Sequence, residues 1–302
     1  MVTAGAVYLQ VVLGSVVRIT GSGLGCPDWP LCHGQVIPAF EYHTMIEYAH
    51  RLVGTAAGLL MVATAVAAVV LFRRSALPRG LVVAAVGAVL LIVVQGVIGG
   101  ITVLMKNSPF TVAIHLGNAE LVLAGSLLVA LWASRRALPA APNRDRGHSV
   151  AWIGAAIAAT YAVIVSGAVV VGTGASGACD AFPLCGRPAG GLTDVHMLHR
   201  VLVGVAAVAV VGAVLAAGRR WRGQGLAVVA PLTLALLLAQ GAVGVLQVLM
   251  GLPPSLRALH VALASAVWAG LVLLASGAWL ERERGGQRVT GPARLTKAEA
   301  NL

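Results

Sequence analysis

Long apolar stretches constrain the fold of this chain more than any other feature of its sequence. Stretches of roughly 18 or more apolar residues recur along almost the whole length, and an α-helix needs about that length to cross a hydrocarbon core about 30 Å thick. Only 10% of the 302 residues are charged and 59% are hydrophobic, whereas an ordinary soluble domain carries about 25% charged residues. The sequence therefore predicts a protein that sits in a lipid bilayer.

The apolar stretches predict helices rather than strands. A transmembrane β-barrel would show segments of about 10 residues with alternating polarity, and the run from Gly54 to Leu71 shows no such alternation. We expect an all-α integral membrane protein whose transmembrane helices occupy residues 2–20, 44–72, 80–104, 110–134, 150–172, 194–217, 226–250 and 257–280. The polar segment that follows, from Glu281 onward, is expected to be disordered.

The net charge of +11 could indicate a nucleic-acid partner, but the basic residues form short clusters between apolar runs instead of a stripe with interleaved aromatics. Arginine clusters occupy every second connection, at residues 73–79, 135–146, 219–222 and 282–284. By the positive-inside rule these connections face the cytoplasm. We expect a cell-membrane protein with both termini cytoplasmic, the cysteine-containing loops outside, and no nucleic-acid partner.

An internal repeat divides the chain into two halves of four helices each. Each half contains a Gly-x-Val-Val segment, a Gly-rich turn, a Cys-x5-Cys loop, a His-Arg pair, a Gln-Gly pair and a further histidine. These features predict two pseudo-symmetric four-helix bundles related by an axis along the membrane normal. The predicted parts are an N-terminal repeat at 1–137, a cytoplasmic linker at 138–148, a C-terminal repeat at 149–281 and a polar cytoplasmic tail at 282–302.

Four histidines occupy matched positions in the repeat, near the outer ends of the second and fourth helices of each half. They are His50, His115, His199 and His260. Two imidazoles on facing helices are what a haem iron needs as axial ligands inside a helical bundle, so each half could hold one haem. Alternatively, each histidine could be interfacial with its polar edge in water, or the set could bind zinc or copper, although structural zinc requires four grouped ligands.

Glu47 lies three residues before His50, on the same helical face, and His196 occupies the matching position before His199. A carboxylate near a membrane span usually marks function or a buried partner. Glu47 could act as a general base, position water or stabilise developing positive charge, or it could be an exposed acid at headgroup level.

Arg51 and Arg200 each follow one of the candidate ligands. Either arginine could snorkel toward water or pair with haem propionates.

The cysteines fall in the two predicted outer loops with equal spacing, as Cys26, Cys32, Cys179 and Cys185. An oxidising outer face favours the disulfides Cys26–Cys32 and Cys179–Cys185. These disulfides could be structural, or they could be exposed dithiol pairs that exchange electrons.

The segment Thr20-Gly-Ser-Gly-Leu-Gly-Cys-Pro-Asp-Trp-Pro-Leu-Cys32, followed by Glu47-x-x-His50-Arg51, resembles the haem A synthase family. The resemblance extends over essentially the whole chain. It implies a membrane-bound haem-dependent oxidoreductase that converts haem O to haem A by oxidising a porphyrin methyl group to a formyl group.

The same resemblance implies roles for individual residues. His50 and His115 would bind the iron of the substrate haem, His199 and His260 would bind the iron of a haem b cofactor, and Glu47 would be the catalytic acid. The expected partners are haem O, membrane lipid, haem O synthase and an electron-transfer partner.

Two other functions are compatible with parts of this pattern. A dihaem electron carrier would also use two histidine pairs, but it has no need for an acid beside only one of them. A transporter is suggested by the repeat itself, but the spans lack matched Gly or Pro interruptions at the midplane.

Overall fold

The structure is a computed structural model that describes residues 1–75, 77–134, 146–186, 190–221 and 228–290, apart from the side chains of residues 146 and 282–290. Its helices are α1 (Val2–Ile19), α2 (Tyr42–Arg73), α3 (Arg79–Leu104), α4 (Pro109–Ala133), α5 (Arg146–Gly172), α6 (Gly191–Arg220), α7 (Val229–Leu249), α8 (Pro254–Thr290) and the short 3-10 helix η2 (Ala175–Gly177). Within the described residues, eight helices are long and apolar enough to cross a membrane. The all-α fold prediction is confirmed, and the chain is a multi-pass membrane protein.

Each predicted span overlaps one observed helix, with ends that differ by a few residues. The largest difference lies at the end of α8, which continues to Thr290 instead of stopping near residue 280. The expected disorder is therefore wrong for residues 281–290, while residues 291–302 lie outside the described part. Helix α5 begins at Arg146, inside the predicted linker, and the linker residues 138–145 are likewise not described.

A buried ion pair ties α8 to α6 at the point where the apolar segment of α8 ends. Arg220, at the end of α6, donates to Oε2 of Glu281 over 2.5 Å, and the indole N–H of Trp221 donates to Oε1 of the same carboxylate. The Arg220 and Glu281 side chains are only 2% and 8% exposed. Because Glu281 is held against α6, the helix has an anchor beyond its apolar segment.

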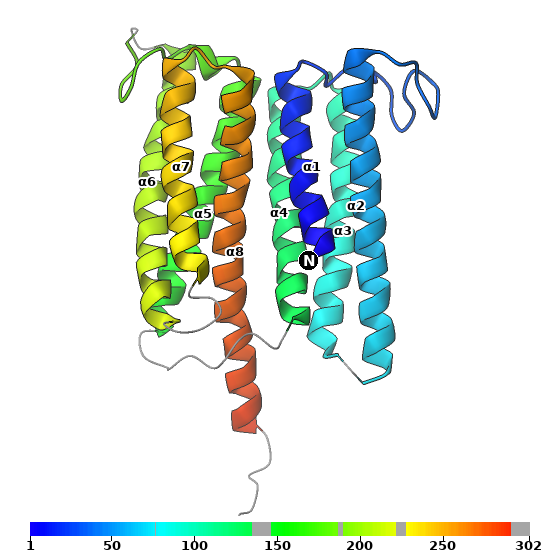
Figure 1. Ribbon diagram of the computed structural model, residues 1–302, viewed down its shortest axis with the longest axis vertical. Coiled ribbons are helices and arrows are strands. Elements are labelled where there is room, and N and C mark those ends of the chain that lie inside the picture. The colour runs from blue at the N-terminus through cyan, green and yellow to red at the C-terminus, as the bar shows by residue number, and fades with distance from the viewer. Residues whose placement is uncertain (76, 135–145, 187–189, 222–227, 291–302) are drawn as a thin grey trace, which may run out of the picture.

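The helices form two groups that stand side by side, α1–α4 and α5–α8 (Figure 1). Helix α8 packs against α1 and α4, and α5 packs against α4, so these helices join the two groups. Both cysteine loops lie at one end of the molecule, together with the α3–α4 and α7–α8 turns (Figure 1). This end is called the loop end below.

Matched turns in the two groups adopt matched backbone conformations. The Gly-rich turns contain Gly21 with φ of 69° and Gly174 with φ of 80°. The turns after α3 and α7 each contain two consecutive residues with positive φ, namely Lys106-Asn107 and Gly251-Leu252. The sequence repeat therefore corresponds to repeated local structure.

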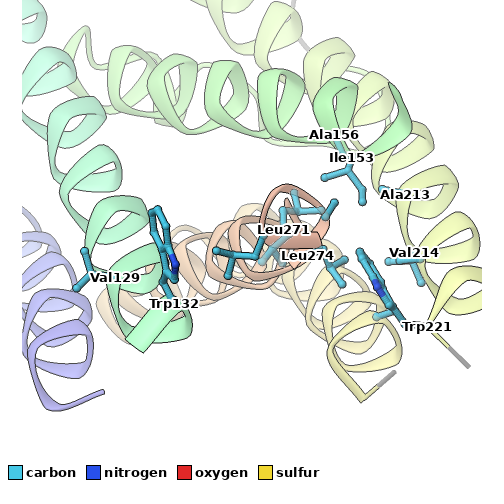
Figure 2. Close-up of a cluster of buried hydrophobic side chains, with 14 of the residues drawn as sticks. Val129, Trp132, Ile153, Ala156, Ala213, Val214, Trp221, Leu271 and Leu274 are labelled. Atoms are coloured by element: carbon cyan, nitrogen blue, oxygen red, sulfur yellow. The ribbon is translucent and has the colours of Figure 1, made fainter. Parts of the chain in front are cut away.

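The main apolar core lies away from the loop end and contains side chains from α2 to α8. Figure 2 shows Trp132, Trp221, Leu271 and Leu274 among its large side chains. Small side chains such as Ala213 are completely buried between the helices, as expected where transmembrane helices approach closely. This packing holds the helices together. The polar side chains described next lie toward the loop end.

Candidate functional site

In the first group, each of the two candidate histidines packs on a neighbouring helix. The Gln10 side-chain amide on α1 lies 3.0 Å from Nδ1 of His50, and that of Gln95 on α3 lies 3.2 Å from Nδ1 of His115. The rings also rest on glycines. A Cβ added to Gly14 would lie 3.1 Å from Cε1 of His50, and one added to Gly99 would lie 3.0 Å from Cε1 of His115.

The second group repeats this arrangement around His199 and His260. A Cβ at Gly167 would lie 3.2 Å from Cε1 of His199, and one at Gly244 would lie 3.1 Å from Cε1 of His260. The Gln240 amide approaches Nε2 of His260 at 3.3 Å, whereas Nδ1 of His199 faces the hydroxyl of a serine, Ser166, at 2.8 Å. All four imidazoles are therefore held by a neighbouring helix in a similar way.

The histidines form pairs and do not join a larger cluster. His50 lies near His115 in the first group, and His199 lies near His260 and His196 in the second. No group of three or more His, Cys, Asp and Glu side chains suited to a metal ion occurs among the described residues. Two imidazoles per half do not provide the four ligands of a structural zinc site, but they fit an iron whose other ligands are porphyrin nitrogens.

Unsatisfied polar atoms beside the histidines also fit a haem ligand. Nδ1 of His260 and the side-chain oxygens of Gln10 and Gln240 are buried without a hydrogen-bond partner. Buried polar atoms are rarely left unpaired. Such atoms are expected at a site whose ligand supplies further contacts.

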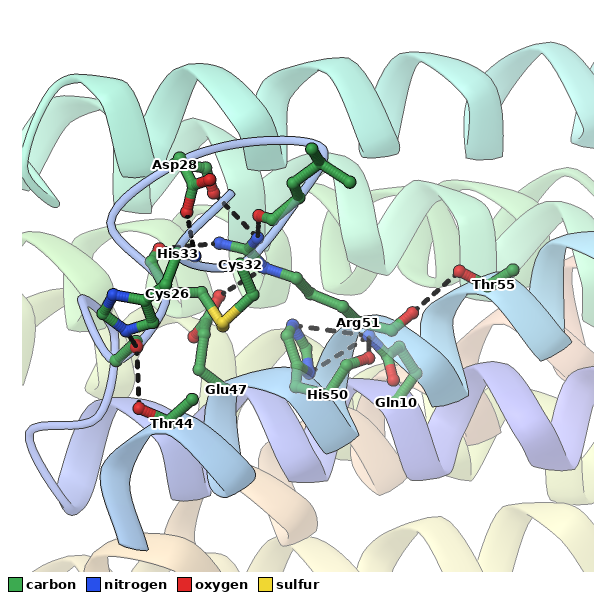
Figure 3. Close-up of polar contacts among 12 residues, drawn as sticks. Gln10, Cys26, Asp28, Cys32, His33, Thr44, Glu47, His50, Arg51 and Thr55 are labelled. Atoms are coloured by element: carbon green, nitrogen blue, oxygen red, sulfur yellow. Dashed lines mark hydrogen bonds and ion pairs between the residues drawn. A yellow bond between two sulfur atoms is a disulfide. The ribbon is translucent and has the colours of Figure 1, made fainter. Parts of the chain in front are cut away.

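Glu47 is buried beside His50, with an exposed fraction of 5%, so it is not an exposed acid at headgroup level. Its Oε1 accepts a hydrogen bond from Nε of Arg51 over 3.2 Å. Arg51 does not snorkel into water, because its guanidinium also donates to the backbone carbonyls of Cys26, Asp28 and Leu31 at 2.7–2.8 Å. Figure 3 shows Arg51 between Glu47 and the cysteine loop. This arginine thereby links the acid to the loop above it.

The matching residues in the second group make fewer contacts and include no acid. Arg200 donates to the carbonyls of Ala181 and Pro183 at 2.8 and 2.9 Å. His196 takes the place of Glu47, and its Nδ1 lies 3.0 Å from the carbonyl oxygen of Ala175. A buried carboxylate next to a candidate ligand is thus a feature of the first group.

Both expected disulfides are present in the structure, Cys26–Cys32 and Cys179–Cys185, each with a Cα–Cα distance of 4.6 Å. Cys26 and Cys32 are 0% and 2% exposed. The Trp29 indole of the same loop packs on α3, because a Cβ at Gly100 would lie 2.7 Å from its ring. The first cysteine loop is therefore fixed over the helix ends that carry the histidines.

Asp28 orders the turn inside the first loop. Its carboxylate oxygens accept hydrogen bonds from the backbone N–H groups of His33 at 2.6 Å and Gly34 at 2.7 Å. The Gly34 and His33 amides and the Arg51 guanidinium lower the pKa of this carboxyl group below its ordinary value. The ionised form of Asp28 is therefore part of the loop structure.

Sequence reasoning missed Glu120, which is completely buried in α4. Its Oε1 accepts a 2.5 Å hydrogen bond from the hydroxyl of Ser265 on α8. Its backbone carbonyl accepts one from the indole N–H of Trp268, also on α8, at 2.9 Å. Glu120 thus joins the two groups. An acid inside a predicted span is costly and was the available signal.

Comparison with known proteins places these features in a family. The sequence profile of the COX15-CtaA family, described as cytochrome oxidase assembly protein, matches residues 1–272. A heme A synthase of Symbiobacterium thermophilum is 34% identical over 280 residues, which cover 88% of this chain and 90% of the relative. A heme A synthase of Alkalihalophilus pseudofirmus is 35% identical over 210 residues, which cover 67% of this chain and 69% of the relative. The chain therefore belongs to the haem A synthase family of cytochrome oxidase assembly proteins.

Proposed function

We propose that this protein converts haem O to haem A by oxidising a porphyrin methyl group to a formyl group. The observation that carries the proposal is the buried Glu47 beside His50, which has no acidic counterpart in the second group. The two histidine pairs are similar, but only the first has an acid beside it. This difference suits a protein that performs chemistry at the first pair and holds a cofactor at the second. The names of the relatives support the same reaction.

His50 and His115 hold the substrate haem in this proposal, and His199 and His260 hold haem b. When bound, haem b supplies a redox centre that exchanges single electrons. The glycines under the four rings keep each imidazole close to the neighbouring helix, and the glutamine amides or the serine hydroxyl orient the rings. The four histidines would then be preorganised to hold haem iron.

Glu47 acts on the substrate side as a proton acceptor or as a stabiliser of positive charge developing next to the ring. Arg51 engages Oε1 of this carboxylate, which leaves Oε2 to face the substrate or a water molecule. Arg51 also ties Glu47 to the first cysteine loop. The loop therefore excludes bulk solvent from the acid and fixes its position.

The proposed orientation places the loop end outside the cell and both termini in the cytoplasm. The arginine clusters support this orientation, since Arg73, Arg79 and Arg219 all lie at the end of the helices opposite to the cysteine loops. Haem O synthase would supply the substrate. With water as the source of the formyl oxygen, the oxidation of the methyl group releases four electrons and four protons, and an electron-transfer partner would accept the electrons.

A pair of matched variants tests the role of the acid. Glu47→Gln should retain haem but form no haem A when the protein is coexpressed with haem O synthase, because the amide cannot accept the proton. His196→Gln changes the equivalent position in the second group and should leave haem A formation in place. Haem A formation at the unaltered rate by the Glu47→Gln protein would remove the proposed role of Glu47.

A further inference from the structure

A small basic pocket lies at the loop end of the first group and takes no part in the contacts described above. It has a volume of about 210 Å³ and is lined by Arg18, Gly21, Gly23, Leu24, Lys106 and Asn107. Arg18 is in the last turn of α1, while Lys106 and Asn107 form the turn between α3 and α4. Segments far apart in the sequence therefore bring two cations to one cavity.

No acidic side chain lines this pocket. Nε of Arg18 is buried without a hydrogen-bond partner. Asp28 and Glu47 are engaged elsewhere, since Asp28 accepts from backbone amides and Glu47 accepts from Arg51. A buried guanidinium nitrogen without an acceptor is costly, and guanidinium and ammonium groups together suit carboxylate or phosphate oxygens.

The pocket lies directly outward from the first histidine pair. On α1, Gln10, Gly14 and Arg18 follow at intervals of four residues and so lie along one side of the helix. Gln10 and Gly14 contact His50, and Arg18 is one turn closer to the loop end, about 6 Å further along the axis. Lys106 lies in the turn that follows α3, the helix whose Gly99 contacts His115. It therefore approaches the pocket from the other side of the site.

The second group lacks the cations at the matching positions. By the register of the repeat, Arg18 corresponds to Val171, and Lys106 and Asn107 correspond to Gly251 and Leu252. The backbone is the same, because both members of each turn pair have positive φ. The difference between the groups is therefore one of side-chain charge and not of fold.

We propose that Arg18 and Lys106 bind the two carboxylate side chains of the substrate porphyrin and so act as an anionic subsite of the first group. The proposal rests on the proposed function, because it requires a haem between His50 and His115. Both carboxylates of a porphyrin are on one edge, and this subsite places that edge toward the loop end. Asn107 adds an amide donor, and the opposite edge of the porphyrin is directed into the bundle.

The test measures haem binding rather than turnover. The protein is purified in detergent from a host without haem O synthase, so that the first group is not filled with substrate. Protohaem and its dimethyl ester, in which the carboxylates carry no charge, are then titrated into the protein and followed by the Soret difference spectrum. Wild type should bind protohaem about tenfold more tightly than the ester, a difference of about 1.4 kcal/mol.

Arg18→Gln/Lys106→Gln should bind the two compounds with equal affinity, at the affinity of wild type for the ester. Arg73→Gln, which removes a cation at the opposite end of α2, should behave as wild type. If the double variant binds protohaem with the affinity of wild type, the proposed subsite is refuted. If the double variant loses copurified phosphatidylglycerol while its haem binding is unchanged, the pocket binds a lipid headgroup, and the proposed subsite is again refuted.

Failure of the proposed function gives a different result from failure of the subsite. If wild type holds one equivalent of haem as purified and binds no more in the titration, the first group is not a haem site and both proposals fall. If wild type binds protohaem and the ester equally, the haem site stands and only the anionic subsite is refuted.

Discussion

Replacement of Arg51 by Gln should loosen the first cysteine loop far more than the matched Arg200→Gln change loosens the second. Arg51 donates to the carbonyls of Cys26, Asp28 and Leu31 and to Glu47. Among the residues that the structure describes, Arg200 instead donates to two carbonyls, both within the second loop. Because Glu47 lies on α2 together with Arg51, the comparison isolates one additional contact between the arginine and its loop.

The size of the difference follows from those contacts. A hydrogen bond to a charged group contributes about 1.5–3 kcal/mol, and the Arg51 side chain is only 15% exposed. With the lower value for the one extra loop contact, Arg51→Gln should lower the free energy of loop opening by about 1.5 kcal/mol more than Arg200→Gln. That difference corresponds to about tenfold faster amide exchange, since about 1.4 kcal/mol is a factor of ten.

Hydrogen–deuterium exchange of the purified protein measures this directly. The reporting amides are those of Gly25, Cys32 and Gln35, which form backbone hydrogen bonds inside the first loop. Glu47→Gln/Arg51→Gln should recover part of the lost protection, because it leaves no buried carboxylate without its cation. Equal acceleration of the two loops in Arg51→Gln and Arg200→Gln would refute the reasoning.

Three further changes have defined outcomes. The pKa of Asp28 is lowered from 3.8 in the folded protein. Its contribution to loop order should therefore be complete above pH 3.8 and lost as the pH falls through the lowered value, which should be seen as faster amide exchange in the first loop. Asp28→Asn should abolish this acid-dependent rise in amide exchange. Gly99→Ala places a methyl group 3.0 Å from His115 and should weaken haem binding in the first group by about 1–3 kcal/mol, whereas Gly96→Ala, with open space at its Cβ, should not change the haem titration. Glu120→Ala removes a completely buried side chain and should destabilise the protein by about 2–5 kcal/mol, seen as a lower Tm in detergent, and a Glu120→Ala protein with unchanged Tm would contradict the interface role.

The helices could be predicted well because the signal is local. A run of apolar residues of sufficient length identifies a span without any knowledge of its neighbours. The contact between α8 and α6 at Glu281 could not be predicted in this way, since its partner Arg220 is 61 residues away in the chain. Contacts between such distant residues are not encoded in hydropathy.

The candidate site could likewise be predicted only in part, namely in the features that depend on residue type and spacing. The repeat reveals the histidines, the cysteines and the unmatched Glu47, because all of these are features of residue type and spacing. The partners of Arg51 are backbone carbonyls 20–25 residues away, so its contacts depend on the folded loop. The position of Glu120 inside a span is visible in the sequence, but its partner Ser265 is not, because it lies 145 residues away in the other half.

The central claim is that the first group oxidises haem O while the second retains haem b. An optical spectrum and extracted-haem analysis of the detergent-purified protein, produced with and without a supply of haem O, test it most directly. The account predicts haem b together with haem O or haem A when haem O is supplied. Two equivalents of haem b alone under both conditions would indicate a dihaem electron carrier and contradict the account.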